Sequence, residues 1–250
     1  MRDITGGDPS LRNDDGSAHP GVAAALADFA AGQGTEHAVM TALAASRLLV
    51  PVIAVLADQL EPGRSATQGE QDEQGEQGEK ASEMAMPTLI GVDGRRAIPA
   101  FTSLESLSRW QSDARPVPVA SLAVWQSACA DSVAVMIDVA GPVPFAVEGA
   151  RLGALARGEA APQPFADPDV QEIVAAVLAS QLHVASFELQ PDDGGHDLAI
   201  VLVLTAEADS EADSEGDVAQ LGAEIAGAVM ARLGGRLRRG VAVWLGDHAS

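Results

Sequence analysis

Four arginines gather in a short stretch of a chain that is otherwise strongly acidic. Arg95, Arg96, Arg109 and Arg115 supply four of its fifteen positive charges within 21 residues, although the formal net charge is −21. Arginine presents a planar fork of donors that binds carboxylate or phosphate groups through paired hydrogen bonds. These four residues are the candidate contact site for an acidic protein partner or a small anion. The alternative is a set of solvated surface charges that pair with acids of the chain itself.

Two further groups of side chains have types that suit a site. Arg236, Arg238 and Arg239 follow the last expected helix, where cations suit the negative end of the helix dipole; they are either a second docking patch or solvated charges. Cys129 would be a nucleophile if a histidine lay near it, because the thiolate is the reactive form. Its place on an alanine-rich helix is more typical of a small buried hydrophobic residue.

One loop collects oxygen and nitrogen donors. Asp192, Asp193, His196 and Asp197 flank two glycines, so they are either ligands for a metal or the polar residues of an exposed hairpin loop. The chain contains no phosphate loop, no G-x-G-x-x-G, no G-x-S-x-G and no H-E-x-x-H, the motifs that mark common nucleotide, nucleophile and zinc sites. The sequence therefore predicts a protein that is not an enzyme, with no catalytic residues, no cofactor and no metal.

The composition predicts a folded core with few aromatic residues. Of 250 residues 47% are hydrophobic, only 3% are aromatic and none is tyrosine. A single cysteine excludes an intramolecular disulfide. The first twenty residues lack the apolar run of a secretion signal, and the longest apolar run, residues 48–57, is about half of the ~20 residues that a membrane helix needs. We expect a cytoplasmic protein without a membrane partner.

The acidity is concentrated in two low-complexity stretches. Residues 61–83 hold seven acids and two bases, and residues 207–217 hold six acids and no base. Such compositions bury too little apolar area to order themselves, so both are expected to be disordered or looped. They are either solvated insertions or acidic interaction tails. A strongly negative chain also argues against nucleic-acid binding.

The opening half is expected to form a mixed-sheet domain with flanking helices, over residues 21–158 and preceded by a flexible arm at 1–20. Helices are expected at 22–30, 37–47, 103–110, 121–132 and 150–157, with strands at 48–57 and 133–141 and a short strand over PFAVEG, residues 144–149.

The stretch MPTLIGVDGRRAIPAFTS, residues 86–103, predicts a hairpin with arginines at its tip. Asp93-Gly94 is a signal for a two-residue turn, which would pair Gly91 with Arg96 and Ile90 with Ala97. The ladder should fail near Thr88 and Pro99, because proline cannot donate a hydrogen bond. Thr102 and Glu105 have the spacing of a capping box for the helix that follows.

The last third reads as a separate, smaller unit. Residues 159–166 have linker composition, and residues 167–246 follow the order α-β-β-α-β, with Asp167 as a helix cap ahead of Pro168. Together the two parts predict an α+β fold with two domains.

Three stretches carry a resemblance to a known family. PTLIGVDGRRAIPAFTSLESLSRW at 87–110, RPVPV at 115–119 and VMIDVAGPVPFAVEGARLGALARG at 135–158 resemble the N-terminal domain of the SseB family, the enhanced serine sensitivity proteins. The α-β-β-α-β tail is similar to that family's C-terminal domain. The resemblance implies no catalytic residues and no cofactor, and we transfer neither serine sensitivity nor the secretion role attached to a shared name.

These observations favour a cytoplasmic protein-interaction module that is not an enzyme. The alternatives are a sensor domain for an anionic metabolite or amino acid and, more remotely, a hydrolase or transferase, which would need a cleft that gathers Cys129 or a histidine beside carboxylates. The oligomeric state and the identity of any protein partner stay open.

Overall fold

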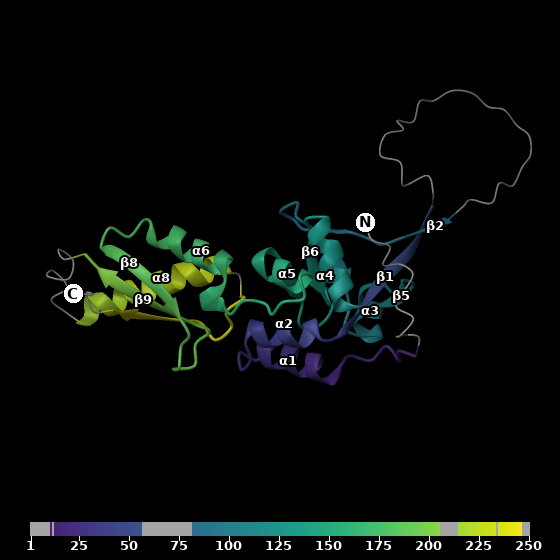
Figure 1. The fold of residues 1–250 in the computed structure, drawn as a ribbon, viewed down its shortest axis with the longest axis horizontal. Helices are drawn as coiled ribbons and strands as arrows, with labels where there is room; N and C mark the ends of the chain where they lie inside the picture. The colour runs from purple at the N-terminus through teal and green to yellow at the C-terminus, as the bar shows by residue number, and fades with distance from the viewer. Residues whose placement is uncertain (1–10, 12, 57–81, 206–214, 234, 247–250) are drawn as a thin grey trace, which may run out of the picture.

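A computed structural model describes residues 11, 13–56, 82–205, 215–233 and 235–246. It confirms the α+β class. Two units lie side by side along the long axis of the molecule, and α5 (Gly149–Ala156) and α6 (Pro168–Leu178) face each other where the units meet (Figure 1).

The N-terminal unit combines helices with two small sheets. Its other helices are α1 (Pro20–Ala30), α2 (Glu36–Ala44), α3 (Leu104–Trp110) and α4 (Ser121–Ala130). Its strands are β1 (Arg47–Leu56), β2 (Ser82–Ala85), β3 (Leu89–Ile90), β4 (Arg96–Ala100), β5 (Arg115–Ala120), β6 (Ala134–Ile137) and β7 (Phe145–Val147).

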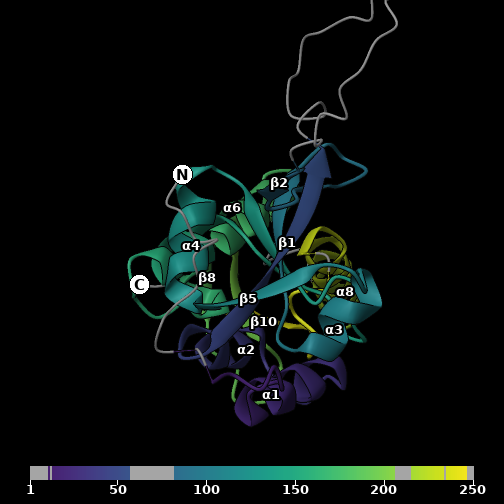
Figure 2. The same ribbon diagram turned by 90° about the vertical axis from the view of Figure 1, so that its right-hand side faces the viewer.

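The two sheets of this unit meet through one bridge. β1 pairs antiparallel with β2 and β5, while the second sheet has the order β3-β4-β6-β7 with a parallel β4–β6 pair. Leu49 and Phe101 exchange backbone hydrogen bonds of 2.8 and 2.9 Å and so join β1 to the end of β4. The end-on view shows β1 and β5 crossing the unit with α1 and α2 below them (Figure 2). Both sheets therefore share one core, whose largest buried side chain is Trp125.

The C-terminal unit has the expected α-β-β-α-β order. It is built from a 3-10 turn η3 (Pro164–Ala166), α6, β8 (Val184–Gln190), β9 (Leu198–Leu204), α8 (Glu215–Leu233) and β10 (Val241–Leu245). β9 pairs antiparallel with β8 and parallel with β10. The hydrophobic faces of α6 and α8 cover one side of this sheet, and their core shares no residue with that of the N-terminal unit.

The two acidic stretches, 61–83 and 207–217, were predicted with C-terminal limits that lie too far along the chain. Most of each lies outside the described residues, but Ser82 and Glu83 belong to β2, where they pair with Leu56 and Val55. The segment 215–217 is the first turn of α8.

The end of the N-terminal arm is held, not free. The guanidinium of Arg47 donates to Asp14 Oδ2 at 2.6 Å and to the Ser17 carbonyl at 2.5 Å. The Leu104 amide donates to the Gly16 carbonyl at 2.8 Å, and a Cβ on Gly16 would lie 2.2 Å from the Leu104 side chain. The expectation of a flexible arm over 1–20 is therefore wrong for residues 14–17, although residues 1–10 lie outside the description.

A buried aspartate changes the start of α3. Asp138 ends β6 at a positive φ of 48°, which aspartate tolerates better than most residues, so the expected strand 133–141 stops early. Its carboxylate accepts from the Thr102 amide at 2.9 Å and from the Thr102 hydroxyl at 2.6 Å. Because Thr102 is occupied in this way, the cap is Ser103, whose hydroxyl accepts from the Ser106 amide at 3.1 Å. The predicted box between Thr102 and Glu105 is wrong.

Candidate functional site

The hairpin that carries Arg95 and Arg96 turns one residue differently from expectation. The observed pairs are Leu89 with Ala97 and Ile90 with Arg96. The Gly94 amide donates to the Gly91 carbonyl at 2.9 Å, and the Gly91 amide donates to the Arg95 carbonyl at 2.8 Å. These bonds define a three-residue loop, 92–94, in which Gly94 alone takes a positive φ of 80°. The two-residue turn was wrong because Asp93 keeps a negative φ.

The short loop fixes Arg95 against two carboxylates. Arg95 Nε donates to Asp93 Oδ2 at 2.6 Å, and Arg95 Nη1 donates to Glu148 Oε2 at 2.8 Å. The hydrogen bond from Arg95 lowers the pKa of Asp93, and the same bond together with Glu148 raises the pKa of Arg95. The side chains of Arg95 and Asp93 are exposed, and that of Glu148 is half-buried. Arg95 is thus held in one orientation on the rim while it remains accessible to solvent.

Arg96 has a different environment. It is exposed, and none of the described residues is seen to form a hydrogen bond or ion pair with its guanidinium. Two large apolar side chains on the same hairpin, Ile90 and Val92, are also exposed. Arginine is one of the residues enriched at the energetic centres of protein interfaces, and here it lies beside exposed apolar area that a partner would cover.

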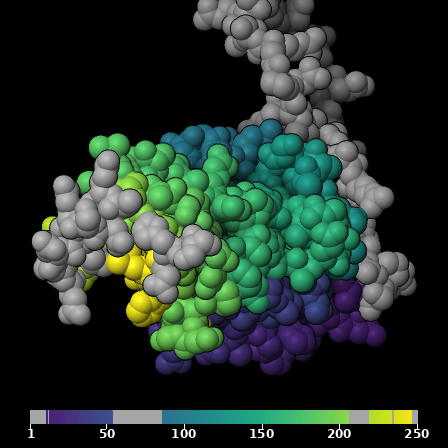
Figure 3. Space-filling view, turned by 60° about the vertical axis from the view of Figure 1, so that its left-hand side comes forward, coloured from purple at the N-terminus to yellow at the C-terminus, as the bar shows by residue number. Residues whose placement is uncertain are grey.

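A hollow of about 500 Å³ lies beside the hairpin. Three segments form it: the hairpin tip, the turn after α4, and the start of α5. Its lining residues are Gly94, Arg95, Arg96, Cys129, Asp131, Ser132, Val133, Ala134, Glu148, Gly149, Leu152 and Gly153. In the space-filling view the blue atoms of the hairpin region lie along the upper edge of the N-terminal unit (Figure 3).

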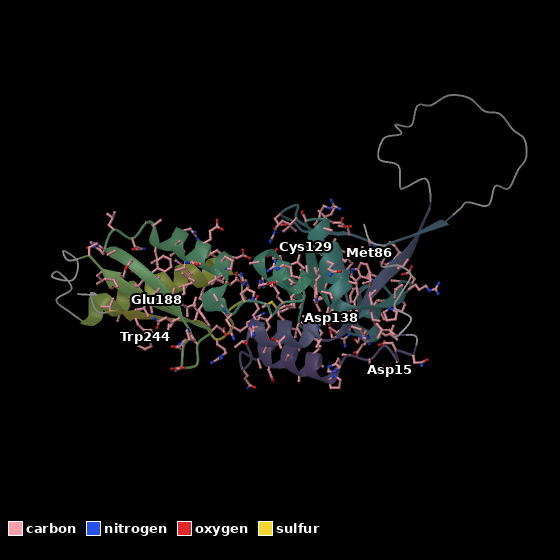
Figure 4. All side chains as sticks on the ribbon, viewed as in Figure 1. Asp15, Met86, Cys129, Asp138, Glu188 and Trp244 are labelled. Carbon is pink, nitrogen blue, oxygen red and sulfur yellow. The ribbon has the colours of Figure 1, made fainter. Side chains whose placement is uncertain are left out.

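Cys129 lines this hollow and is exposed, so the expectation of a buried cysteine is wrong. The buried face of α4 runs through Val124, Trp125 and Ala128, and it leaves Leu122 and Cys129, seven residues apart, on the solvent side. Figure 4 labels Cys129 near the upper edge of the unit and Asp138 deeper within it. The lining contains a thiol, two guanidinium groups and two carboxylates, but no histidine.

The other two predicted arginines do not join this hollow. Arg109 lies in the last turn of α3 and pairs with Glu105 at 2.6 Å, four residues earlier on the same helix. Arg115 is the exposed first residue of β5, opposite Val52 of β1. In Figure 1, α3 lies at the lower side of the unit. The candidate site is therefore reduced to Arg95 and Arg96.

The loop with possible metal donors is a hairpin loop closed by its own hydrogen bonds. Asp192 Oδ2 accepts from the His196 amide at 2.8 Å and lies 3.0 Å from His196 Nδ1. The buried Asp197 accepts from the Arg239 amide at 2.8 Å, and burial raises the pKa of its carboxyl. Among the described residues no three histidine, cysteine or acidic side chains are arranged to hold a metal ion.

The second arginine cluster is used inside the molecule. Arg236 forms ion pairs with Glu36 at 3.1 Å and with Asp167 at 2.5 Å. Arg238 lies over the ring of Phe29, 5.2 Å from its centre. The contacts with Glu36 and Phe29 run from the C-terminal unit to the N-terminal unit, so Arg236 and Arg238 are not available as a docking patch.

Sequence reasoning missed Glu148, the carboxylate that orients Arg95. It precedes α5 by one residue and is 53 positions away from Arg95. A resemblance over residues 87–158 placed both residues in one domain, but no sequence pattern brought them together.

The described helices include none that is both long and apolar enough to span a bilayer. Comparison with known protein families identifies the class of protein to which this fold belongs. The family described as the SseB protein N-terminal domain matches residues 22–154. The chain belongs to the SseB family. No curated protein and no solved structure gives a match.

Proposed function

We propose that this SseB-family protein is a cytoplasmic protein-interaction module and not an enzyme, and that its contact surface is the β3–β4 hairpin. Ile90, Val92 and Arg96 are exposed together on this hairpin, and Arg95 is held in place by Asp93 and Glu148. The observation that supports the proposal is this exposed combination of two aliphatic side chains and a guanidinium that pairs with none of the described residues. A partner segment with a carboxylate and an adjacent apolar side chain would match it.

The chemistry of the hollow supports contact in preference to turnover. A cysteine nucleophile needs a neighbouring base or a strong cationic environment to become a thiolate. Cys129 shares its hollow with two arginines, but also with Asp131 and Glu148, and with no histidine. Among the described residues that line the hollow, no nucleophile is therefore paired with a base.

Charge reversal at the hairpin provides the test. Replacing Arg95 and Arg96 together with glutamate should lower recovery of the partner from the native host at least tenfold, because both attractive charges become repulsive. The measurement is quantitative mass spectrometry after affinity purification at native expression levels.

The double variant Arg109→Glu/Arg115→Glu is the matched control, since it changes the net charge equally on other elements. Its recovery should equal that of the unaltered chain. Equal losses in both double variants would mean that only overall charge matters, and no loss in either would reject the hairpin as the contact surface.

A second candidate, a sensor of a small anionic metabolite, is favoured by the hollow itself. Its volume of about 500 Å³ suits a small molecule, and Arg96 would supply a guanidinium that pairs with a carboxylate or phosphate. In this alternative the apolar residues of the hairpin are incidental.

Thermal unfolding with a panel of amino acids, dicarboxylates and phosphorylated metabolites tests the sensor. A ligand at ten times its dissociation constant contributes about 1.4 kcal/mol, which corresponds to about 3–6 °C in a domain of this size. The shift should disappear in Arg96→Gln. A flat response across the panel would remove the sensor hypothesis and leave the interaction module.

A further inference from the structure

The two units of the chain are joined by polar contacts, while each keeps a hydrophobic core of its own. The core of the N-terminal unit draws on residues between Val22 and Ala161, and the core of the C-terminal unit on residues between Val170 and Leu237. Figure 3 shows the green atoms of the C-terminal unit lying directly against the teal atoms of the N-terminal unit. Polar interfaces between separately cored domains allow relative motion more readily than apolar ones.

Four charged side chains form the centre of this junction. Glu36 begins α2, Arg151 lies in α5, Asp167 caps α6, and Arg236 follows α8. The exposed fractions of their side chains are 4%, 2%, 1% and 17%, in that order. Two carboxylates and two guanidinium groups balance in charge, which is the condition under which buried ions are tolerated.

One ion pair of this cluster lies within the N-terminal unit, and another joins the two units. Arg151 and Glu36 are hydrogen-bonded within the N-terminal unit. Arg236 donates to Glu36 at 3.1 and 3.2 Å and to Asp167 at 2.5 Å, so it is the side chain that reaches across from the C-terminal unit. Removing Arg236 leaves the Arg151–Glu36 pair in place and takes away the hydrogen-bonded ion pair between the units. Across the junction it leaves Arg151 Nε at 4.0 Å from Asp167 Oδ2 and Arg238 over the ring of Phe29.

A second contact supports the same junction. Asp169 Oδ2 of α6 accepts from the Ala150 amide at the start of α5, at 2.9 Å. Gly149 permits this approach, because a Cβ at that position would lie 2.0 Å from the same oxygen. Gly149 also lines the hollow beside the hairpin, so docking of the C-terminal unit fixes one wall of that hollow.

We propose that Arg236 is a latch between two separately folded units, and that its loss releases the C-terminal unit from the SseB domain without unfolding either. The structure shows the closed state. In the open state the Glu36–Arg151 pair stays within the N-terminal unit, and the wall of the hollow at Gly149 loses its support from Asp169. This inference is independent of whether the hairpin binds a protein or a small anion.

A distance measurement in the full chain tests the latch. The chain has one cysteine, Cys129, which is exposed in the N-terminal unit. The substitution Ala176→Cys adds a second exposed site on α6 in the C-terminal unit. Spin labels on both residues report the separation of the units by pulsed electron resonance, and far-ultraviolet circular dichroism reports whether each variant is folded.

The spin-labelled chain that keeps Arg236 should give one narrow distribution of distances between the two labels. Arg236→Met should give a broad distribution with a longer mean, with unchanged circular dichroism. Arg232→Met is the matched control, because Arg232 is an exposed arginine in the last turn of α8, and it should keep the narrow distribution. Arg236→Lys keeps the charge but loses the fork that reaches both carboxylates, so it should add a longer second population.

Two results would overturn the latch. A folded Arg236→Met or Arg236→Lys chain with the unaltered narrow distribution would show that other contacts hold the units together. An Arg236→Met chain that loses its secondary structure would show that the two units do not fold separately.

Discussion

Replacing Arg151 with methionine is expected to lower the free energy of unfolding by about 3–5 kcal/mol, because it leaves two buried carboxylates, Glu36 and Asp167, with the single guanidinium of Arg236 and so one buried charge uncompensated. Arg151 is 2% exposed and is paired with Glu36, which is 3% exposed. Burial raises the pKa of Glu36 and lowers the pKa of Arg151, which means that desolvation disfavours the charged form of each group. The charge of the partner opposes this effect in both cases. Urea unfolding followed by tryptophan fluorescence measures the change.

Two comparisons make this expectation specific. Arg157→Met removes an arginine next to the same helix whose side chain is exposed and paired with Glu159, and a surface pair of this kind contributes at most about 1 kcal/mol. The double variant Glu36→Met/Arg151→Met should lose less than the sum of the single variants, since it leaves no unpaired charge within the N-terminal unit. A loss below about 1 kcal/mol for Arg151→Met alone would contradict the argument.

Asp138→Ala should also be strongly destabilising. It leaves the buried Thr102 amide and hydroxyl without the acceptor that binds both, and each unpaired buried donor costs about 1–3 kcal/mol. Alanine also tolerates the positive φ of 48° poorly. Asp138→Asn keeps an acceptor and suits that backbone conformation, so it should lose clearly less. Equal losses in both variants, measured by urea unfolding, would contradict this role for the carboxylate.

The pH dependence of Asp138 has a definite sign. Burial raises the pKa of its carboxyl more than the hydrogen bonds from Thr102 lower it, so the folded state holds this proton more tightly than the unfolded chain. The contribution is therefore fully present below the unfolded pKa of about 3.9 and is lost as pH rises through the folded value. Relative to Asp138→Asn, the unaltered chain should lose stability as the pH rises above about 4. A gain over that range would contradict the assignment.

Elements of the fold could be predicted from the sequence where helix caps and apolar spacing agreed with the residues that are buried. Asp167 followed by Pro168 predicted the start of α6, and the Asp167 side chain caps that helix through the Asp169 amide. The apolar spacing of α6 and the two apolar runs of β8 and β9 predicted the α-β-β-α-β order. These signals are local, so neighbouring residues alone decide them.

Predictions failed where a distant residue competed for a local group. Thr102 has the spacing of a helix cap, but the carboxylate of Asp138, 36 positions later, takes its amide and hydroxyl. Cys129 was predicted on the wrong face of α4. The faces of an alanine-rich helix differ little in hydrophobicity, so the sequence does not show clearly which face is buried. The hairpin register shifted by one residue because the Asp93 side chain accepts the Arg95 amide and favours a three-residue loop.

The hairpin position of one arginine pair followed from the sequence. Arg95 and Arg96 lie directly after the loop of a hairpin, while their role as a contact site stays a prediction. The grouping of this pair with Arg109 and Arg115 followed sequence proximity, whereas the structure places those two on α3 and β5. Arg236 was visible as a charge at the end of a helix, but its partner Glu36 is 200 positions away, and no periodicity relates the two.

A photo-reactive amino acid in place of Val92 gives the most direct test of the hairpin as a contact surface. Val92 is exposed at the tip, between Ile90 and the two arginines, and Leu182 offers an equally exposed control position in the C-terminal unit. In the native host, irradiation should join position 92 to an acidic segment of a protein partner, and the product should disappear in Arg95→Glu/Arg96→Glu. Crosslinked products that still form after the charge reversal, or that form equally at position 182, would contradict the hairpin as the contact surface.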